Sequence, residues 1–257
     1  MRKIVSLILT VIIISALFSG CVVSVETNFE YENSDKYTMG SATIDGKVKK
    51  VDIGWCDGKI DIEYSFSIDN VVFYEKSATN TNETNTLYHW LEDDGTLHIM
   101  FCKSGNHKFQ DYKKDLTVII PNYIELEEIN INSVTSDISI KGENNGVELL
   151  QVRTVAGDNL DVTMNKIDSL NISVVSENVD VKLAQTPEDV NIDTVSGNIR
   201  FSVPSDSKFI VEYDTVSGGF DCDFANVKQG DRRIINNGEA VYKFNTVSGN
   251  LVVTSNS

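Results

Sequence analysis

The chain has 257 residues, of which 38 are Asp or Glu and 22 are Lys or Arg, so its formal net charge is −16. A surface of that sign repels nucleic-acid phosphates and anionic lipid headgroups, which argues against DNA or RNA binding. It could attract cationic partners or divalent ions, although most acidic surfaces only keep a secreted protein soluble.

Residues 1–20 are predicted to be a lipoprotein signal peptide. A charged start, Met1-Arg2-Lys3, precedes an apolar run over 4–17, and Phe18-Ser19-Gly20 leads into Cys21. The apolar run is shorter than the roughly 20 residues that a transmembrane helix needs. The segment resembles a bacterial lipobox, in which the Cys receives acyl chains such as palmitate and begins the mature protein, although Phe18 stands where Leu is usual. The alternative is an ordinary secretory signal with an incidental Cys.

We expect an acidic tether over 21–36 and one β-solenoid domain over 37–257. Val51–Ile62 alternates apolar and polar residues on both sides of an Asp-Gly corner, and Glu92–Ile99 repeats this pattern more loosely. Alternation with period two is typical of strands that bury one face. Between these two segments, Ser77–Thr86 is polar and predicts a protruding loop.

A recurring corner motif dominates the second half of the chain. It reads TVSGNI at 194–199, TVSGGF at 215–220 and TVSGNL at 246–251, with weaker copies at 133–138, 154–160 and 174–179. The Val at the second position of each copy recurs at intervals of 21, 20, 20, 21 and 31 residues. Such a period predicts an all-β fold, a single-stranded parallel β-helix or β-solenoid with coils of about 20 residues. A β-sandwich also has short, regularly spaced strands, but it does not require the same corner in every unit.

Stacking in chain order would align equivalent positions of successive coils in columns. One inward column is expected to contain Ile138, Leu160, Val179, Ile199, Phe220 and Leu251. An outward column would contain Asp161, Asp180, Arg200 and Asp221, with Arg200 between Asp180 and Asp221. This column is the one candidate for a catalytic groove, because glycan-active β-helices place carboxylates together with a base or an Arg. Acidic columns also arise by default on any acidic solenoid.

The interval of 31 residues contains an insertion, Ala225–Ala240, with the adjacent pair Arg232 and Arg233. It is interpreted either as a contact loop or, preferably, as a flap that caps the last coil. Solenoids need capped ends because an open strand edge pairs with other chains.

No pattern in the sequence indicates a catalytic motif, a cofactor site or a metal site. His98, Met100 and Cys102 alternate along one predicted strand face, but a soft-metal site would need a further ligand column. Cys222 falls on an inward column and is interpreted as a small buried residue. A disulfide between Cys56 and Cys102 is a minority alternative.

The chain resembles the bacterial DUF4097 family, whose members are often labelled as adhesins. The similarity lies in KDLTVIIP at Lys114–Pro121, in Leu126–Ile140 with its corner, in the TVSG copies that end at Val253, and in the opening segment Val51–Ile62. The resemblance implies an envelope-associated β-solenoid. It implies no reaction or ligand, and the adhesin label is itself an inference from the fold.

The leading hypothesis is therefore a non-enzymatic, lipid-anchored module on the extracytoplasmic face of a bacterial membrane, acting as an adhesin-like binding protein or an envelope scaffold. Its partners would be the membrane, through Cys21, and an envelope protein or glycan whose identity the sequence does not give. The alternative is a glycan-active lyase or hydrolase that uses the Asp161, Asp180, Arg200 and Asp221 column. A third hypothesis is an assembly protein that pairs through its C-terminal edge. The TVSG corner itself is interpreted as a structural element that keeps the coils in register.

Overall fold

The computed structural model describes residues 27–107, 113–230 and 232–256, and in this part of the chain the fold is all-β and solenoid-like. Its one helical element there is a three-residue 3₁₀ turn, η1 (Ser34–Lys36). The predicted signal peptide, Cys21 and the start of the tether lie outside the described residues. Among the described residues, no helix has the length and the apolar character to cross a bilayer.

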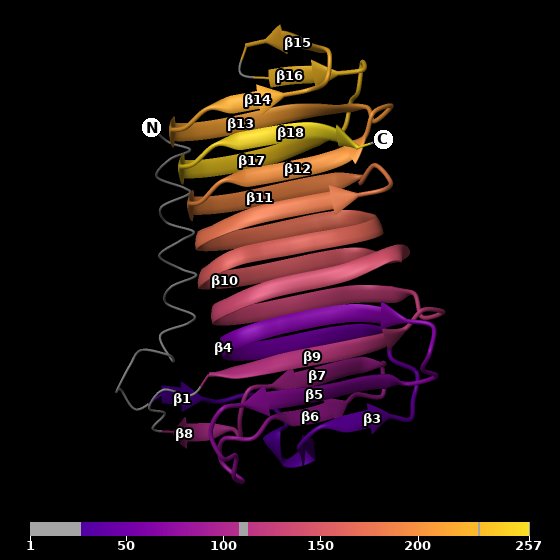
Figure 1. Ribbon diagram of the computed structural model, residues 1–257, viewed down its shortest axis with the longest axis vertical. Coiled ribbons are helices and arrows are strands. Elements are labelled where there is room, and N and C mark those ends of the chain that lie inside the picture. Colours follow the sequence, from indigo (N-terminus) through magenta and orange to yellow (C-terminus); the bar gives the residue numbers. More distant parts are fainter. Residues whose placement is uncertain (1–26, 108–112, 231, 257) are drawn as a thin grey trace.

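The N-terminal strands are β1 (Thr27–Phe29), β2 (Thr38–Met39), β3 (Ala42–Ile44), β4 (Lys50–Ser65), β5 (Val71–Ser77), β6 (Tyr88–Leu91), β7 (Thr96–Met100), β8 (Gly105–His107) and β9 (Lys114–Pro121). The remaining strands are β10 (Leu126–Leu183), β11 (Asp189–Ser196), β12 (Ile199–Pro204), β13 (Phe209–Ser217), β14 (Phe220–Cys222), β15 (Asn226–Gln229), β16 (Arg232–Ile235), β17 (Val241–Ser248) and β18 (Leu251–Asn256). The long β10 includes its own corners and winds through several coils (Figure 1).

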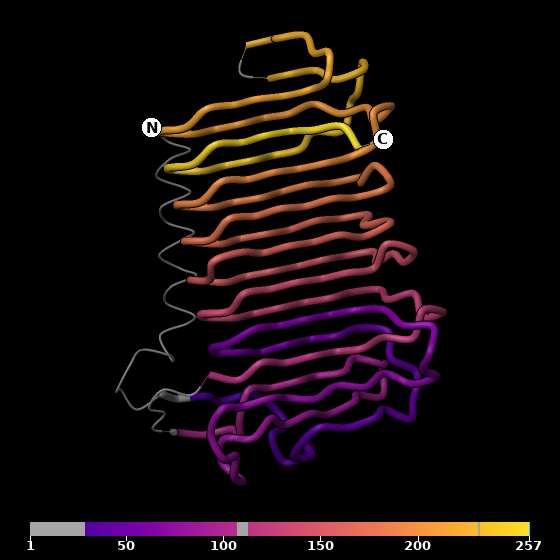
Figure 2. Tube along the Cα trace, viewed as in Figure 1, coloured from indigo at the N-terminus to yellow at the C-terminus, as the bar shows by residue number. Residues whose placement is uncertain are grey.

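Each coil runs along one face of a flattened stack, turns at a tight corner and returns along the other face (Figures 1 and 2). Successive coils pair in parallel with a shift of 20 residues, as in Leu170 opposite Val190 on the first face and Val179 opposite Ile199 on the second. This parallel register excludes a β-sandwich, in which neighbouring strands run antiparallel. The tight corners lie along one edge of the stack, and wider bends lie along the opposite edge.

The core lies between the two faces and is built by the alternation that the sequence shows. Val179, Ile199 and Leu251 are at most 1% exposed, and they form part of one inward column. Phe201 contacts Phe244 from the opposite face with ring centroids 5.5 Å apart. Removing such a side chain leaves a cavity in close-packed surroundings, and a large-to-Ala change costs about 3–5 kcal/mol.

The coils do not follow chain order at the C-terminal end. The last coil, β17 and β18, lies between the coil of β11 and β12 and the coil of β13 and β14, as the yellow segment in Figure 2 shows. The expectation that Arg200 lies between Asp180 and Asp221 is therefore wrong, because Val252 is the register partner of both Arg200 and Asp221. Cys222 is only half-buried, since β14 pairs with β18 alone and is the outermost strand of its face.

The insertion makes this order feasible. After β14 the chain forms an antiparallel hairpin, β15 and β16, in which β16 pairs with β13 over Phe209–Glu212. The chain then continues into β17, which pairs with β13 on the side away from β16. The outermost edge of the first face is thus covered by a hairpin, and the chain's own last strands lie inside the stack.

The N-terminal end shows a matching departure from chain order. β4 lies between β10 on one side and β7 and β9 on the other, in parallel with all three. Beyond them, β6 and β5 run antiparallel to β7 and β9, and β2 and β3 close the end. β4, which forms the first coil of the solenoid, therefore lies between strands that follow it in the sequence.

Candidate functional site

A polar groove of about 620 Å³ runs along the corner edge, where the TVSG copies stack. Its lining comes from Gly157, Asp158, Ser176, Glu177, Asn178, Ser196, Gly197, Asn198, Ser217, Gly218, Ser248, Gly249 and Asn250. Close approach of the coils explains the glycines. A Cβ on Gly197 would lie 1.9 Å from the Glu177 carbonyl oxygen, and a Cβ on Gly218 would lie 1.8 Å from that of Gly249. Only Gly permits such contact between backbones.

The Asn residues of the corners form a hydrogen-bonded ladder along this groove. The backbone N–H of Asn198 donates to Asn178 Oδ1 at 3.1 Å, that of Asn250 to Asn198 Oδ1 at 3.0 Å, and that of Gly219 to Asn250 Oδ1 at 2.7 Å. The Asn250 side-chain amide also donates to Asn198 Oδ1 at 3.2 Å. The amide groups are thus largely satisfied between coils, which supports the interpretation of the corner as a structural element.

Glu177 occupies the position that is Gly in the TVSG copies. Its side chain is 3% exposed, and a Cβ on Gly157 would lie 2.6 Å from Glu177 Oε1, so the carboxyl fills the space that the glycine leaves. Neither carboxyl oxygen has a hydrogen bond of ordinary geometry to any described residue. Burial, with repulsion from Asp137, raises the pKa of Glu177 to about 8, although the nearby Thr154 hydroxyl opposes this shift. The group is therefore mainly protonated at neutral pH.

The candidate catalytic column does not converge into a cleft. Arg200 Nε lies 3.7 Å from Asp180 Oδ2, and both side chains are at least half exposed on the flat second face. Partial burial, together with the charge of Asp161, raises the pKa of Asp180, and Arg200 opposes this. Asp221 stands apart beyond Val252. No residue of this column lines the corner groove or either of the two hollows on the opposite edge.

The adjacent arginines of the insertion both contact their own chain. Arg232 donates from Nε to Glu212 Oε1 at 2.7 Å, with Nη2 at 2.6 Å from the same oxygen. The Arg233 guanidinium lies 5.6 Å from the centre of the Phe220 ring. These contacts attach the hairpin to the coil of β13 and β14. The hairpin therefore covers the end of the stack, but not the last coil in the sequence, which lies inside the stack.

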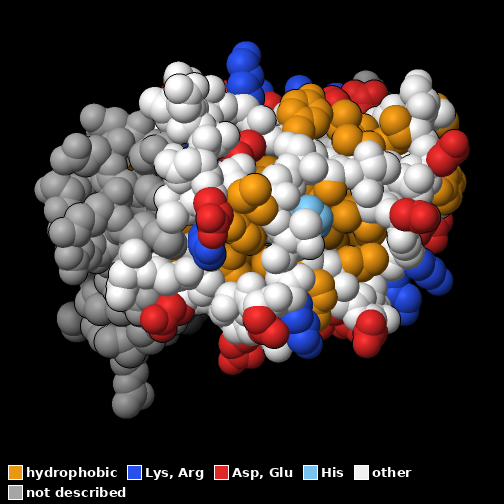
Figure 3. Space-filling model, turned by 90° about the horizontal axis from the view of Figure 1, so that it is seen from below, with side chains coloured by type: hydrophobic (Ala, Val, Ile, Leu, Met, Phe, Trp, Pro, Cys, Tyr) orange, Lys and Arg blue, Asp and Glu red, His pale blue; other side chains and the backbone are white. Residues whose placement is uncertain are grey.

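His98 does not join Met100 and Cys102 in a ligand set. Its Nδ1 lies 2.8 Å from Asp52 Oδ2, its Nε2 lies 3.2 Å from Glu92 Oε1, and its ring stacks on Trp90. Burial disfavours the charged ring, but the two carboxylates outweigh it and raise the pKa of His98. Figure 3 views the stack from the end that β2 and β3 close, where a histidine lies among apolar side chains. Within the described ranges, no group of three or more His, Cys, Asp and Glu has the geometry to hold a metal ion.

Lys114, from the KDLTVIIP segment, is a fully buried cation that the sequence reasoning missed. Its Nζ lies 2.6 Å from Glu75 Oε2 and donates to the carbonyl oxygens of Asn85 and Phe101. Burial lowers the pKa of Lys114 despite the Glu75 carboxylate. Glu75 also accepts from the Thr86 hydroxyl at 2.6 Å, so this ion pair anchors the end of the polar 77–86 loop, most of which protrudes as predicted. The signal in the sequence was a Lys at an inward position of an alternating strand.

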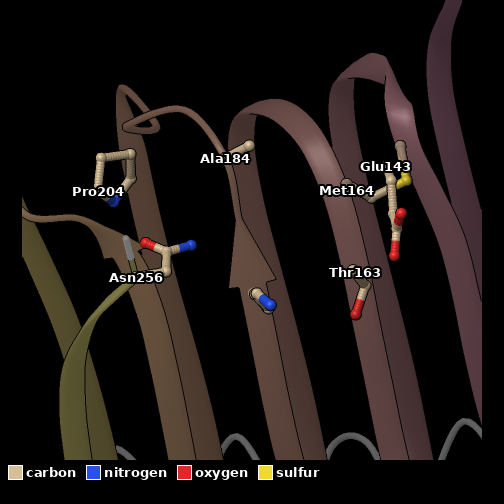
Figure 4. A pocket seen from close by; sticks show the side chains of 7 residues that line it. Glu143, Thr163, Met164, Ala184, Pro204 and Asn256 are labelled. Atoms are coloured by element: carbon tan, nitrogen blue, oxygen red, sulfur yellow. The ribbon is translucent and has the colours of Figure 1, made fainter.

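Two hollows lie on the opposite edge, at the wider bends. The first, of about 370 Å³, spans several coils (Figure 4). Its lining consists of Glu143, Thr163, Met164, Lys182, Ala184, Pro204 and Asn256. The second, of about 450 Å³, lies among the loops around β4, and we call it the loop groove. Its lining consists of Gly46, Lys47, Val48, Lys49, Asp69, Asn70, Val71, Tyr123, Ile124, Glu125 and Glu127. Sequence periodicity does not indicate the loop groove, because mainly irregular loops build it.

Comparison with known proteins gives a family and a fold. The family model described as Toastrack DUF4097 matches residues 45–254. A protein solved as a "putative cell adhesion protein" from Clostridium sporogenes is 15% identical, with a TM-score of 0.52 over 86% of this chain and 99% of that chain. A "putative adhesin" from Bacteroides fragilis is 17% identical, with a TM-score of 0.38 over 86% of this chain and 97% of that chain. At 15% identity, the likeness to the Clostridium sporogenes protein concerns the fold alone. No curated protein matches the sequence significantly.

Proposed function

Because the chain belongs to the Toastrack DUF4097 family, we propose that it is a non-enzymatic binding module of the bacterial cell surface, adhesin-like or acting as an envelope scaffold. In this proposal, acyl chains on Cys21 hold it on the extracytoplasmic face of the membrane, and the acidic segment 21–36 is its tether. The strands that pair in parallel form one solenoid with coils of about 20 residues, which presents a rigid surface to an envelope protein or a glycan.

The observation that carries the proposal is that the candidate catalytic residues line none of the three grooves described above. Acid–base catalysis of glycan cleavage needs two carboxyl groups on either side of a bound bond, at a separation of about 5–10 Å in a shared cleft. Here Asp180 lies near Asp161 and Arg200, but on an exposed face and outside any of these grooves. Val252 separates this group from Asp221. A rigid stack with large exposed faces and no converging acid–base pair among these residues suits binding better than turnover.

The surface assignment is tested in intact cells. The full chain should be labelled by a membrane-impermeant reagent and should incorporate a palmitate analogue, whereas Cys21→Ser should lose the acyl label. A cytoplasmic, unlipidated protein would refute the assignment.

The alternative of a glycan-active enzyme is favoured by one observation, the raised pKa of Asp180 beside Arg200. Purified protein should be incubated with neutral and anionic polysaccharides, and release of reducing ends or unsaturated products should be followed. Cleavage that is lost in Asp180→Asn would establish the enzyme, and the binding proposal would then fail.

A further inference from the structure

We propose that the loop groove is a saccharide-binding site in which the Tyr123 ring is the stacking platform. The inference rests on the proposed binding function and assigns to it a place and a class of ligand, namely a neutral, hydroxyl-rich sugar chain.

The groove is built where two strands end side by side. β4 and β9 pair in parallel up to Ser65 opposite Pro121, and the backbone N–H of Asn122 donates to the Ser65 carbonyl oxygen at 2.8 Å. Both strands therefore leave the sheet at the same edge, which is the edge with the wider bends in Figure 1. The loop before β4, the loop before β5 and the loop before β10 supply the three walls. A volume of about 450 Å³ lies within the roughly 300–1,000 Å³ of small-molecule sites.

Tyr123 is exposed and yet held in place. Its side chain is 70% exposed, while its hydroxyl donates a hydrogen bond to the Asp69 carbonyl oxygen across the groove. Phe66, which follows β4 at the same edge, is 80% exposed. A tethered aromatic ring loses little conformational entropy when a ligand stacks on it, so the site is preorganised. Aromatic rings offer a flat apolar face, which suits the C–H face of a pyranose ring.

The polar groups around Tyr123 favour a neutral ligand. The groove contains two ammonium groups, Lys47 and Lys49, and three carboxylates, Asp69, Glu125 and Glu127. Lys49 is paired with Glu127 at 3.3 Å. Ammonium groups donate hydrogen bonds and carboxylates accept them, whereas a sugar hydroxyl group can do both. The two kinds of side chain can therefore bind the hydroxyl groups of a neutral sugar. A polyanion would face the carboxylates and the overall charge of −16, and a polycation would face the two lysines.

The corner groove is larger, but it suits a ligand less well. Its amide groups already bond to one another from coil to coil, as in the contact of Asn198 N–H with Asn178 Oδ1. A ligand there would have to compete with hydrogen bonds that hold the stack together. The lining of that groove also includes no aromatic ring.

Binding should be measured on the full-length chain in detergent, by saturation-transfer NMR and calorimetry. The probes are neutral oligomers of glucose, mannose and N-acetylglucosamine. We expect at least one oligomer to bind, Tyr123→Ala to weaken its affinity about tenfold or more, and Tyr123→Phe, which keeps the ring without its tether, to weaken it less. Tyr74→Ala is the matched control, because Tyr74 is 44% exposed on β5 outside the groove. Circular dichroism of each variant checks that the fold is retained.

The inference is overturned if no oligomer binds at millimolar concentration, or if Tyr123→Ala binds as tightly as the unmodified chain. In either case a lipidated, surface-exposed protein without glycan-cleaving activity would leave the proposed function standing. A protein that fails the surface assay would refute the proposed function whatever the result with sugars.

Discussion

The buried carboxyl of Glu177 predicts a stability that depends on pH. Its pKa is about 8 in the folded chain, against an ordinary value of 4.5. Because folding raises this pKa, the folded state holds the proton more tightly, and the unfolded state ionises first as the pH rises. The free energy of unfolding therefore falls between about pH 4.5 and pH 8, by about 1.4 kcal/mol per unit of pH. The loss reaches about 3 kcal/mol at pH 7 and about 5 kcal/mol above pH 8.

Glu177→Gln removes the ionisation and nearly preserves the shape of the side chain. We expect it to leave stability almost unchanged at pH 4 and to raise the free energy of unfolding by about 3 kcal/mol at pH 7. This corresponds to a Tm increase of roughly 6–12 °C for a domain of this size. Denaturant unfolding followed by circular dichroism at pH 4, 7 and 9 measures the difference.

Glu188→Gln provides the control, since Glu188 is an exposed Glu in the bend before β11. It should change stability little at any of the three pH values. If Glu177→Gln gave the same difference at pH 4 and pH 9, or none at all, Glu177 would not be a buried protonated acid and the reasoning would be refuted.

Three further predictions concern the ion pair, the corner and the cap. Lys114→Ala leaves the Glu75 carboxylate without its buried partner and should lower the free energy of unfolding by about 3–5 kcal/mol. The control, Lys113→Ala at an exposed position, should lower it little. Thermal unfolding compares the two variants, and equal Tm values would contradict the buried pair. Gly197→Ala forces a Cβ to within 1.9 Å of the Glu177 carbonyl oxygen and should lower the free energy of unfolding by about 1–3 kcal/mol or more. Gly219→Ala should lower it less, because its Cβ would lie 3.2 Å from Asn250 Oδ1. Denaturant unfolding measures both, and the reverse order would contradict the close stacking. Deleting Asn226–Ile235 exposes the edge of β13 and should make the protein self-associate, as light scattering would show; a monomer would argue against the cap.

The repeated part of the fold follows from local sequence alone. Alternation of period two decides which side chains face inward, and Ser-Gly-Asn decides where the chain turns, because Gly permits the contact that a Cβ at position 197 would block. Both are properties of a few neighbouring residues. The ladder of Asn178, Asn198 and Asn250 is equally implied, since identical corners at a fixed period lie above one another.

The sequence alone indicated less about the candidate functional surfaces than about the coils. Arg232 and Arg233 stood out because they interrupt the period, and the structure gives them contacts with Glu212 and Phe220. Glu177 was visible as a departure from Gly, but its burial depends on Gly157 in the coil next to it. Tyr123 lies in a loop without periodicity, so nothing local indicated that it faces Asp69.

What the sequence by itself determined is the coil, including its strands, its corner and its inward column. What only the tertiary structure decided is the order of the coils at the two ends. Leu251 packs as well between Ile199 and Phe220 as it would beyond Phe220, because every coil presents the same apolar column to its neighbours. Such equivalent positions carry no information about sequence order. The choice depends on which edges remain uncovered and on what the chain can reach, and these are properties of the whole molecule.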